Sequence, residues 1–521
     1  MGKANDKVLF WASFLTLIAA GVGFSIRGAI LFEWGKQFGY TQTELGTITG
    51  AGLWGFPITI IALSFVADRI GYGFLMVLAF LLHTSSAVVT LAATPVFHAY
   101  GKDATFQCLY WGSFIFALAN GTCEAVINPL TATLFPREKT HWLNILHAGW
   151  PGGLILGALL GLVFNLVGNV RWEIQMAMFL IPTVIYGIMM LGRTFPRSEA
   201  AVAGVPFATM LLEFVSPILL FLLLLHAMVG YVELGTDSWI ANITGTILEH
   251  KNYGLMLFIW TSGLMFVLRF FAGPIVHKIS PLGLLLVSAI LACTGLLMLG
   301  QANAALACVL AATIYGFGKT FFWPTMLGVV SERFPKGGAL TLGAIGGVGM
   351  LSAGLLGGPG IGYKQDYFAT QNLETKDPAA YQRYKSDETK SFLTFPAIAG
   401  LDGSKVAALA DNGAQIDSDI QALEKSGRSI QSDPKLAQLN NWWQSAKTYA
   451  PADKGPVEAA RLYGGKMALT YTAVVPAAMA VGYLILIIYF RTRGGYKAQV
   501  LVGHMAKDEE FTGGVEGPAE L

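Results

Sequence analysis

The sequence predicts an all-α integral membrane protein of twelve transmembrane helices, built as two pseudo-symmetric six-helix bundles with a polar outer insertion between the last two helices. Of its 521 residues, 54% are hydrophobic and only 13% are charged, whereas soluble domains carry about 25% charged residues. Apolar runs of about 20 residues, the length that crosses a bilayer, recur along the chain. The two halves also resemble each other weakly, as in membrane proteins built from structural repeats.

Twelve apolar runs set the predicted helices and domain boundaries. They cover 8–32, 45–66, 74–94, 106–134, 142–168, 172–192, 215–240, 253–276, 281–300, 304–332, 338–358 and 467–490. We expect an N-terminal bundle at 1–192, a cytoplasmic linker at 193–213, helices 7–11 at 214–359, an extracytoplasmic insertion at 360–465, helix 12 at 466–491 and a cytoplasmic tail at 492–521. The insertion should form amphipathic helices, as at 404–426, without a hydrophobic core of useful size.

The distribution of Lys and Arg predicts the orientation, because short cytoplasmic loops of membrane proteins carry an excess of both. With the N-terminus inside, the outer loops hold Lys36, Lys102, Arg171 and Lys251. The cytoplasmic segments hold Lys3, Lys7, Arg69, Arg137, Lys139, Arg193, Arg197, Lys278, Arg333, Lys336, Arg491, Arg493 and Lys497. We therefore expect both termini in the cytoplasm, and we place the chain as a multi-pass protein of a bacterial cell inner membrane.

A repeat pairs the fourth predicted helix with the tenth. Residues 121–129 read GTCEAVINP and residues 316–324 read GFGKTFFWP, with Gly and Pro eight positions apart in both. The matching positions are Asn120, Glu124 and Asn128 in the first half and Tyr315, Lys319 and Trp323 in the second. The first half therefore offers a carboxylate where the second offers a cation.

Polar residues in the middle of the fourth helix form the first candidate site. Asn120, Glu124 and Asn128 share one helical face. An ionisable group at the bilayer centre costs about 2.5–3.5 kcal/mol, so Glu124 should have a role in transport or form a buried ion pair. Lys319 could contact a substrate or form a salt bridge between the halves.

Two further helices carry polar stripes. On the seventh span, Glu233 follows His226 and precedes Asp237 on one face, and Glu233 could line a central cavity. On the fifth span, Asn144 and His147 share a face. His147 could relay protons, because the unperturbed pKa of histidine is about 6.5, or it could be a hydrogen-bonded structural residue.

Two arginines also lie in predicted spans. Arg27 must be paired or face water because arginine is always charged, and its partner could be Glu124, Glu33 or an anionic substrate. Arg269 lies close to the expected cytoplasmic end of the eighth span, where we interpret it as a snorkelling or gate residue.

Several function classes find no support in the residues. The four cysteines have neither metal-ligand spacing nor the pattern of a disulfide framework, and no enzyme motif or phosphate loop is visible. We expect no enzyme activity, metal or cofactor. A net charge of +2 gives no field for nucleic acid. We expect a monomer in contact with membrane lipid.

The loop after the second span carries a family signature. Residues 64–73 read SFVADRIGYG, and Asp68, Arg69 and Gly71 match the pattern G-x-x-x-D-R-x-G-R. With this motif, the chain resembles the major facilitator superfamily. The resemblance extends over nearly its whole length, the insertion excluded. The resemblance implies that Asp68, Arg69 and Gly71 belong to a gate on the cytoplasmic side. Ser64 and Tyr72 depart from the pattern.

Within that superfamily, one group matches the fourth helix. Glu124-x-x-x-Asn128-Pro129, followed by Leu143-Asn144, resembles the fucose-permease group of sugar:proton symporters. The resemblance implies that Glu124 takes part in sugar binding and proton coupling. That group has a carboxylate in its first helix, where this chain has Arg27.

Three hypotheses remain open. The first is a secondary active transporter that moves a small polar solute, a sugar together with a proton, by alternating access around a midplane site. The second is a transporter of small organic anions that uses Arg27 and Lys319. The third is a membrane receptor or sensor that does not transport. The two-fold repeat counts against it, because sensing does not require alternating access.

Overall fold

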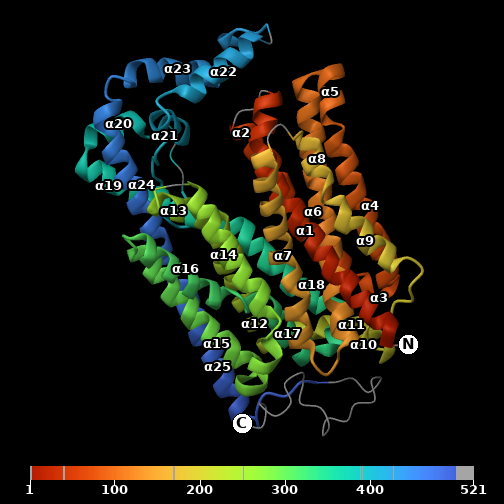
Figure 1. Cartoon of the computed structure of the whole chain (residues 1–521). Helices are drawn as coiled ribbons and strands as arrows, with labels where there is room; N and C mark the ends of the chain where they lie inside the picture. The colour runs from red at the N-terminus through yellow and green to blue at the C-terminus, as the bar shows by residue number, and fades with distance from the viewer. Residues whose placement is uncertain are drawn as a thin grey trace.

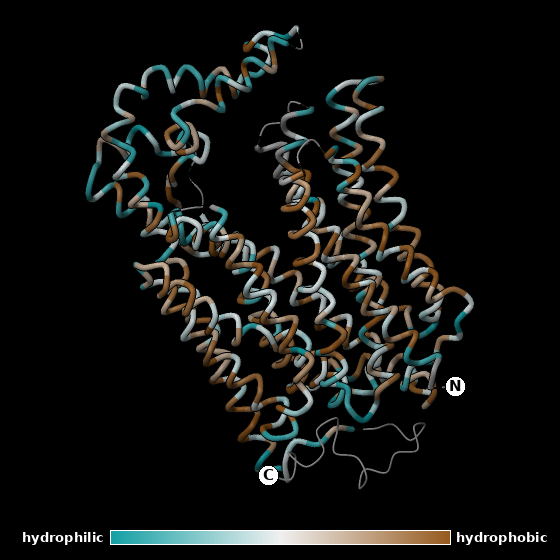
Figure 2. The backbone as a smooth tube through the Cα atoms, viewed as in Figure 1, coloured by the Kyte–Doolittle hydropathy of each residue, from teal (hydrophilic) through white to brown (hydrophobic). Residues whose placement is uncertain are grey.

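The computed structural model describes residues 3–38, 42–167, 170–249, 251–387, 389, 391–425 and 427–499. Figure 1 shows two bundles of long helices side by side, with both ends of the chain at one end of the molecule and a smaller helical unit at the other. We call these the termini end and the insertion end. In Figure 2 apolar residues dominate the long helices, and hydrophilic residues gather in the insertion.

The first half consists of six membrane passes in chain order. They are α1 (Lys3–Phe38), α2 (Gln42–Ser64), α4 (Tyr72–Leu91) extended by α5 (Ala93–Tyr100), α6 (Lys102–Leu134), α7 (Lys139–Val167), and α8 (Trp172–Ala177) followed by α9 (Leu180–Met190). The short α3 (Ala67–Ile70) joins α2 to α4. The linker between the halves contains α10 (Glu199–Val202), α11 (Phe207–Leu212) and the 3-10 turn η1 (Glu213–Val215).

The second half repeats this plan with more interruptions. Its passes are α12 (Pro217–Gly230) with the π-helical turn η2 (Tyr231–Gly235) and α13 (Thr236–Ile247); α14 (Lys251–Arg269); α15 (Ala272–Gln301); α16 (Ala305–Lys319) with α17 (Phe322–Arg333); α18 (Gly338–Ser352) with the π-helical turn η4 (Ala353–Gly357) and α19 (Gly358–Lys376); and α24 (Ala450–Thr472) with α25 (Val474–Thr492). The short η3 (Pro335–Gly337) precedes α18.

The predicted membrane helices are all present. Among the described residues, ten helical stretches are long and apolar enough to cross a membrane. The polar α6, with 33 residues, and α14, with 19, are the two further passes. The prediction of an all-α protein of two six-helix bundles is confirmed.

Interruptions in the second half place polar groups at the centre. The eighth pass breaks after Arg269 and continues in the first residues of α15, which turn sharply at Ser280 (φ 64°) before Pro281. Arg269 therefore lies within the pass. The prediction that it lies close to the cytoplasmic end of the eighth span is wrong. The two π-helical turns pack against each other, because Gly235 lacks a Cβ that would lie 2.7 Å from the Cα of Gly357.

The insertion is an ordered helical unit. The flanking membrane helices continue into it, since α19 ends at Lys376 and α24 begins at Ala450, well beyond the predicted boundaries of 359 and 466. Between them lie α20 (Pro378–Tyr384), α21 (Gly403–Ala410), α22 (Ala414–Lys425), η5 (Ile430–Ser432) and α23 (Pro434–Ala446). The expectation of no core is wrong: fourteen buried residues, among them Tyr384, Leu409, Trp443 and Val457, pack together. The two long helices α19 and α24, which we call the stalk, supply the surface on which this core forms.

One buried ion pair fastens α20 to the stalk. Arg383 donates from Nε and Nη2 to the two carboxylate oxygens of Asp453, at 2.7 and 2.5 Å. The side chain of Asp453 is 1% exposed and that of Arg383 is 26% exposed. Such bidentate pairs combine charge with fixed geometry.

The far end of the insertion approaches the first half. Burial raises the pKa of Asp419 in α22, and the positive charge of Lys102, the first residue of α6, partly offsets this rise. The unit carried by the second half therefore extends above the first half, as Figure 1 also shows for α22 and α23.

We expect Asp453→Ala to loosen the insertion without unfolding the bundles. Loss of hydrogen bonds to a charged group costs about 1–3 kcal/mol when the remaining partner can reach water, which is about a 5- to 150-fold faster amide exchange in α20. Hydrogen exchange measures this. The control is Asp387→Ala, because Asp387 is 71% exposed and lies 3.6 Å from Lys405. Equal exchange in both variants would contradict the stated role of the pair.

Candidate functional site

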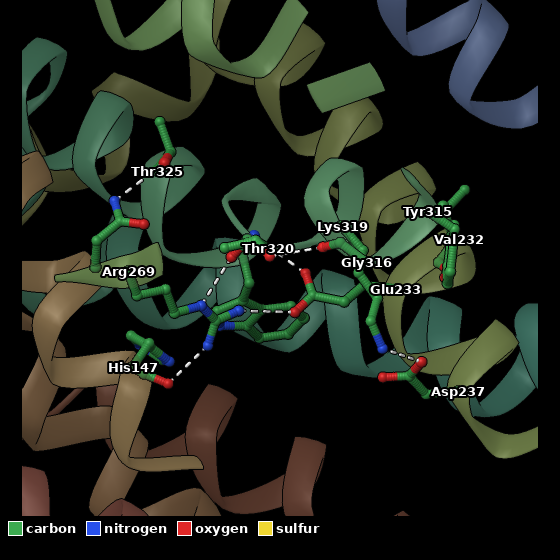
Figure 3. A network of polar contacts seen from close by, with 12 residues as sticks. His147, Val232, Glu233, Asp237, Arg269, Tyr315, Gly316, Lys319, Thr320 and Thr325 are labelled. Carbon is green, nitrogen blue, oxygen red and sulfur yellow. Dashed lines mark hydrogen bonds and ion pairs between the residues drawn. The ribbon is translucent and has the colours of Figure 1, made fainter. Parts of the chain in front are cut away.

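A buried arginine joins the two halves at the centre of the molecule. Arg269 is 2% exposed. Its Nη2 donates to Glu233 at 3.0 Å, its Nε to the backbone oxygen of Thr320 at 2.7 Å, and its Nη1 to the backbone oxygen of His147 at 2.6 Å. Figure 3 shows the guanidinium group between these three acceptors. Because His147 belongs to the first half and Arg269 to the second, the hydrogen bond from Arg269 to His147 joins the two halves directly.

Prolines explain why both carbonyl oxygens are free to accept. In a helix, the oxygen of residue i accepts from the N–H of residue i+4, and proline has no N–H. Pro151 stands four residues after His147, and Pro324 stands four residues after Thr320. Arg269 therefore supplies the two donors that the helix backbones lack at Pro151 and Pro324. Pro151 and Pro324, both in the middle of predicted spans, are the sequence signal for this site.

Glu124 lies in a polar cluster beside this bond. Asn128 donates to the Glu124 carboxylate at 2.6 Å, and His147 Nε2 lies 2.8 Å from Asn128 Oδ1 and 3.9 Å from Glu124 Oε2. All three residues are at most 7% exposed. Glu124, Asn128 and His147 thus form one cluster between the fourth and fifth helices, a contact that the sequence did not predict, and among the described residues no Lys or Arg lies within 4 Å of Glu124.

The π-helical turn η2 directs Glu233 into the site. One oxygen of Glu233 accepts from Arg269, and the other accepts from the backbone N–H of Trp323 at 3.2 Å. Tyr315 donates to the backbone oxygen of Val232 in the same turn at 2.7 Å. π-helical turns interrupt the 3.6-residue period and are frequent at functional sites.

Lys319 does not face Glu124 across the centre. Its Nζ donates to Asp237 at 2.5 Å, a pair within the second half that Figure 3 shows apart from Arg269. Lys319 is fully buried and the side chain of Asp237 is 17% exposed. The expected salt bridge between the halves is therefore wrong for Lys319. Arg269 makes that connection instead.

Two predicted residues point into the first half and not toward the central cluster. Asn120 Oδ1 lies 2.9 Å from the ring of His83 on α4. Four residues turn a helix by 400°, so each step of four drifts about 40° around the axis. Two such steps separate Asn120 from Asn128, which is why the predicted common face fails at Asn120.

Arg27 also belongs to the interior of the first half. It donates to Ser86 at 2.7 Å, and its guanidinium lies 3.8 Å from the ring centroid of Phe116. Among the described residues no ion pair joins it to Glu124 or Glu33. The hydroxyl group and the aromatic face are therefore the contacts that replace a carboxylate partner.

Asn144 makes a second connection between the halves. It donates to Thr140 of its own helix at 2.9 Å and to Thr325 of α17 at 3.1 Å. Asn144 is fully buried. The halves are thus bonded at the centre and toward the termini end, while in Figure 1 they diverge toward the insertion end.

A family model described as Major Facilitator Superfamily matches residues 12–358. The chain belongs to this superfamily. The members of this superfamily are transporters and not enzymes, as predicted. The match ends where α19 begins, so the insertion lies outside it. No curated protein matches the chain in sequence.

Solved transporters of the superfamily share the fold. The proton:xylose symporter XylE of E. coli is 13% identical, with 71% of this chain and 91% of that chain covered and a TM-score of 0.60. FucP in the outward conformation, a fucose:proton symporter of E. coli, is 16% identical, with 70% and 93% covered and a TM-score of 0.56. A bacterial homologue of the lysosomal transporter Spinster is 14% identical, with 93% and 97% covered and a TM-score of 0.59.

The superfamily signature loop contacts the other half at the termini end. Asp68 accepts from the backbone N–H of Ala339, the second residue of α18, at 3.3 Å. Gly338 has φ 52°, and a Cβ there would lie 2.6 Å from the Asp68 carboxylate. Tyr72, a departure from the signature, donates to Asp68 at 3.2 Å. Burial raises the pKa of Asp68, and these hydrogen bonds partly offset the rise.

The other two signature residues support this contact. The guanidinium of Arg69 lies 4.5 Å from the ring centroid of Phe207 in the linker. Gly71 has φ 93°, a left-handed conformation that favours glycine. Arg69 and Gly71 thus lie at the contact between the halves where the family resemblance predicts a gate.

A reciprocal contact runs from the second half to the first. Glu332 of α17 accepts from the backbone N–H and the hydroxyl of Thr140, the second residue of α7, at 3.1 and 2.6 Å. Its other oxygen accepts from the hydroxyl of Tyr496, beyond α25, at 2.7 Å. Each half thus places a carboxylate at the start of a helix of the other half, where the helix dipole favours negative charge. Glu332 and Tyr496 are not among the residues that the sequence predicts for the site.

We expect Asp68→Ala to weaken closure at the termini end. Loss of a capping carboxylate costs about 0.5–2 kcal/mol, which raises the open population by roughly 2- to 30-fold. The readout is the labelling rate of an Ala132→Cys variant whose native cysteines are replaced, because Ala132 is buried near this contact. Asp103→Ala, at the start of α6 toward the insertion end, is the control. An unchanged labelling rate for Asp68→Ala would show that the carboxylate does not hold the halves together.

Proposed function

We propose that the protein is a symporter that moves a sugar together with a proton, by alternating access around the central cluster. The observation that carries this proposal is the state of the buried charges. Glu124 has no Lys or Arg partner within 4 Å among the described residues, whereas Arg269 and Lys319 are bonded to Glu233 and Asp237. A carboxyl group without a strong cationic partner is free to exchange a proton.

The paired cations favour a neutral solute over an anion. An anionic solute would need to displace Glu233 or Asp237 from a buried ion pair, and breaking such a pair costs about 3–5 kcal/mol. Arg27 lies between helices of the first half, against Phe116 and Ser86. The organic-anion hypothesis rested on Arg27 and Lys319, and neither offers an unoccupied charge at the centre. The superfamily fold favours transport over sensing.

The geometry suggests how the proton is coupled to movement. The Glu124 carboxylate is bonded to Asn128, whose amide oxygen contacts the ring of His147, whose backbone oxygen accepts from Arg269. A proton on Glu124 removes the charge that Asn128 faces and changes the position of His147. We propose that this change releases or restores the Arg269 bond, and so sets which end is open.

We also propose that the insertion end faces the outside and that both termini are cytoplasmic, in a bacterial inner membrane. The distribution of Lys and Arg supports this orientation. In the described conformation the bonds between the halves lie at the centre and the termini end, so a solute would enter from the insertion end.

We expect Glu124→Gln to abolish uphill uptake while retaining downhill exchange. Glutamine keeps the size and hydrogen bonding of the side chain but cannot titrate. One proton crossing 100 mV supplies about 2.3 kcal/mol, which supports roughly 40- to 50-fold accumulation, and the variant should fall to no accumulation. The measurement is uptake of D-xylose and L-fucose by proteoliposomes with an imposed proton gradient, together with counterflow.

A matched control is Glu458→Gln, which changes an exposed carboxylate of α24 in the insertion and should accumulate solute as the wild type does. If Glu124→Gln concentrates sugar at the wild-type rate, Glu124 is not the coupling residue. If the wild type transports neither these nor other neutral sugars but accumulates small carboxylates, the sugar proposal itself is wrong.

A further inference from the structure

His226 is a buried histidine whose ring has no hydrogen-bond partner. It lies on α12, is fully buried, and neither ring nitrogen has a partner among the described residues. Its ring packs against Trp323, with centroids 4.6 Å apart and planes inclined at 56°. A neutral imidazole has one donor and one acceptor, and leaving each buried without a partner costs about 1–3 kcal/mol.

The ring lies at the same depth as the central cluster. His226 is nine residues from the start of α12 at the termini end, and Glu124 is ten residues from the end of α6 there. His147 is eight residues from the start of α7 at that end, and Trp323 is ten residues from the end of α17. At 1.5 Å per residue these positions are roughly 12–15 Å from the termini end. They form one layer across the two halves.

The space around the ring is fitted closely. Gly349 of α18 faces both side chains, and a Cβ at this position would lie 2.8 Å from His226 Cδ2 and 2.7 Å from Trp323 Cζ3. A side chain at 349 would therefore displace one of the two rings. The glycine allows a histidine and a tryptophan to lie together in the central layer.

We propose that His226 and Trp323 form a subsite for a hydroxyl group of the transported solute, which rests on the proposed sugar symport. An alcohol hydroxyl can donate or accept a hydrogen bond, so it can pair with either ring nitrogen of a neutral imidazole, one nitrogen for each hydroxyl. The indole offers an apolar face beside it, and carbohydrates present C–H groups next to their hydroxyls. A buried polar group without a partner is the feature expected where a ligand supplies the missing bond.

The same surroundings disfavour a cation as the ligand. Arg269 lies in the same central region, bonded to Glu233, and no carboxylate contacts the ring of His226 among the described residues. A metal site would need further ligands, and the described residues contain no group of three His, Cys, Asp or Glu that could hold a metal.

The test is the affinity of purified protein for D-xylose and L-fucose, measured by calorimetry. We expect His226→Leu to bind the better of the two at least 10-fold more weakly. Its thermal stability without sugar should be unchanged or higher, because no hydrogen bond is lost. His226→Gln retains a donor and an acceptor and should recover part of the affinity. His98→Leu, an exposed histidine of α5, is the matched control.

Three outcomes would overturn the proposal. Sugar affinity of His226→Leu within two-fold of the wild type removes His226 from the site, even if Glu124→Gln still loses uphill uptake. A large drop in stability without sugar shows that the ring is structural. Binding of neither sugar, nor of any other neutral sugar, by the wild type contradicts the proposed function and the subsite together.

Discussion

The burial of Arg269 is the constraint on which the centre of this protein depends. A guanidinium group that is always charged must find acceptors when it is 2% exposed. It finds them in Glu233 and in two backbone oxygens that Pro151 and Pro324 leave without a helical donor. The breaks near Arg269 and Thr320 and the π-helical turn at Glu233 follow from this arrangement, since each brings an acceptor within reach. The result is one bond network shared by the two bundles, which would have to move apart in the proposed transport cycle.

The remaining bonds between the halves are weak individually and lie toward the termini end. Asp68 and Glu332 each hold the start of a helix in the opposite half, and Asn144 reaches Thr325. Contacts of this kind contribute about 1–2 kcal/mol each, so a ligand or a proton can shift the balance between closed and open ends. The insertion, which is rooted in α19 and α24 of one half, extends toward the other half, where the positive charge of Lys102 acts on Asp419.

Hydrophobic runs, the signature loop and the repeated fourth and tenth helices predict most of the fold from the sequence. Glu124, Asn128 and His147 were each candidate site residues in the sequence, because polar and ionisable groups inside a membrane span need a partner or a role. That His147 lies beside the other two was not predicted, because helical spacing does not show which faces of two helices meet. Arg269, Glu332 and His226 were not predicted as site residues, since their roles depend on broken helices and on contacts between distant segments. For Lys319 the sequence left substrate contact and a salt bridge between the halves open, and it missed Asp237 as the partner, because a repeat predicts equivalent positions and not which carboxylate is nearer. The core of the insertion escaped prediction because its apolar residues are scattered over four short helices and the two long helices α19 and α24.

The most direct test of this account is the distance between the halves at the termini end when Arg269 is lost. Spin labels on Arg137→Cys and Lys336→Cys, exposed positions in the two halves, report it by double electron–electron resonance in a background without native cysteines. The double variant Arg269→Met with Glu233→Gln removes the cross-half bond without leaving a buried carboxylate unpaired, and Glu233→Gln alone retains it. The account predicts a shift to longer distances in the double variant only. The same distance distribution in both variants would contradict it.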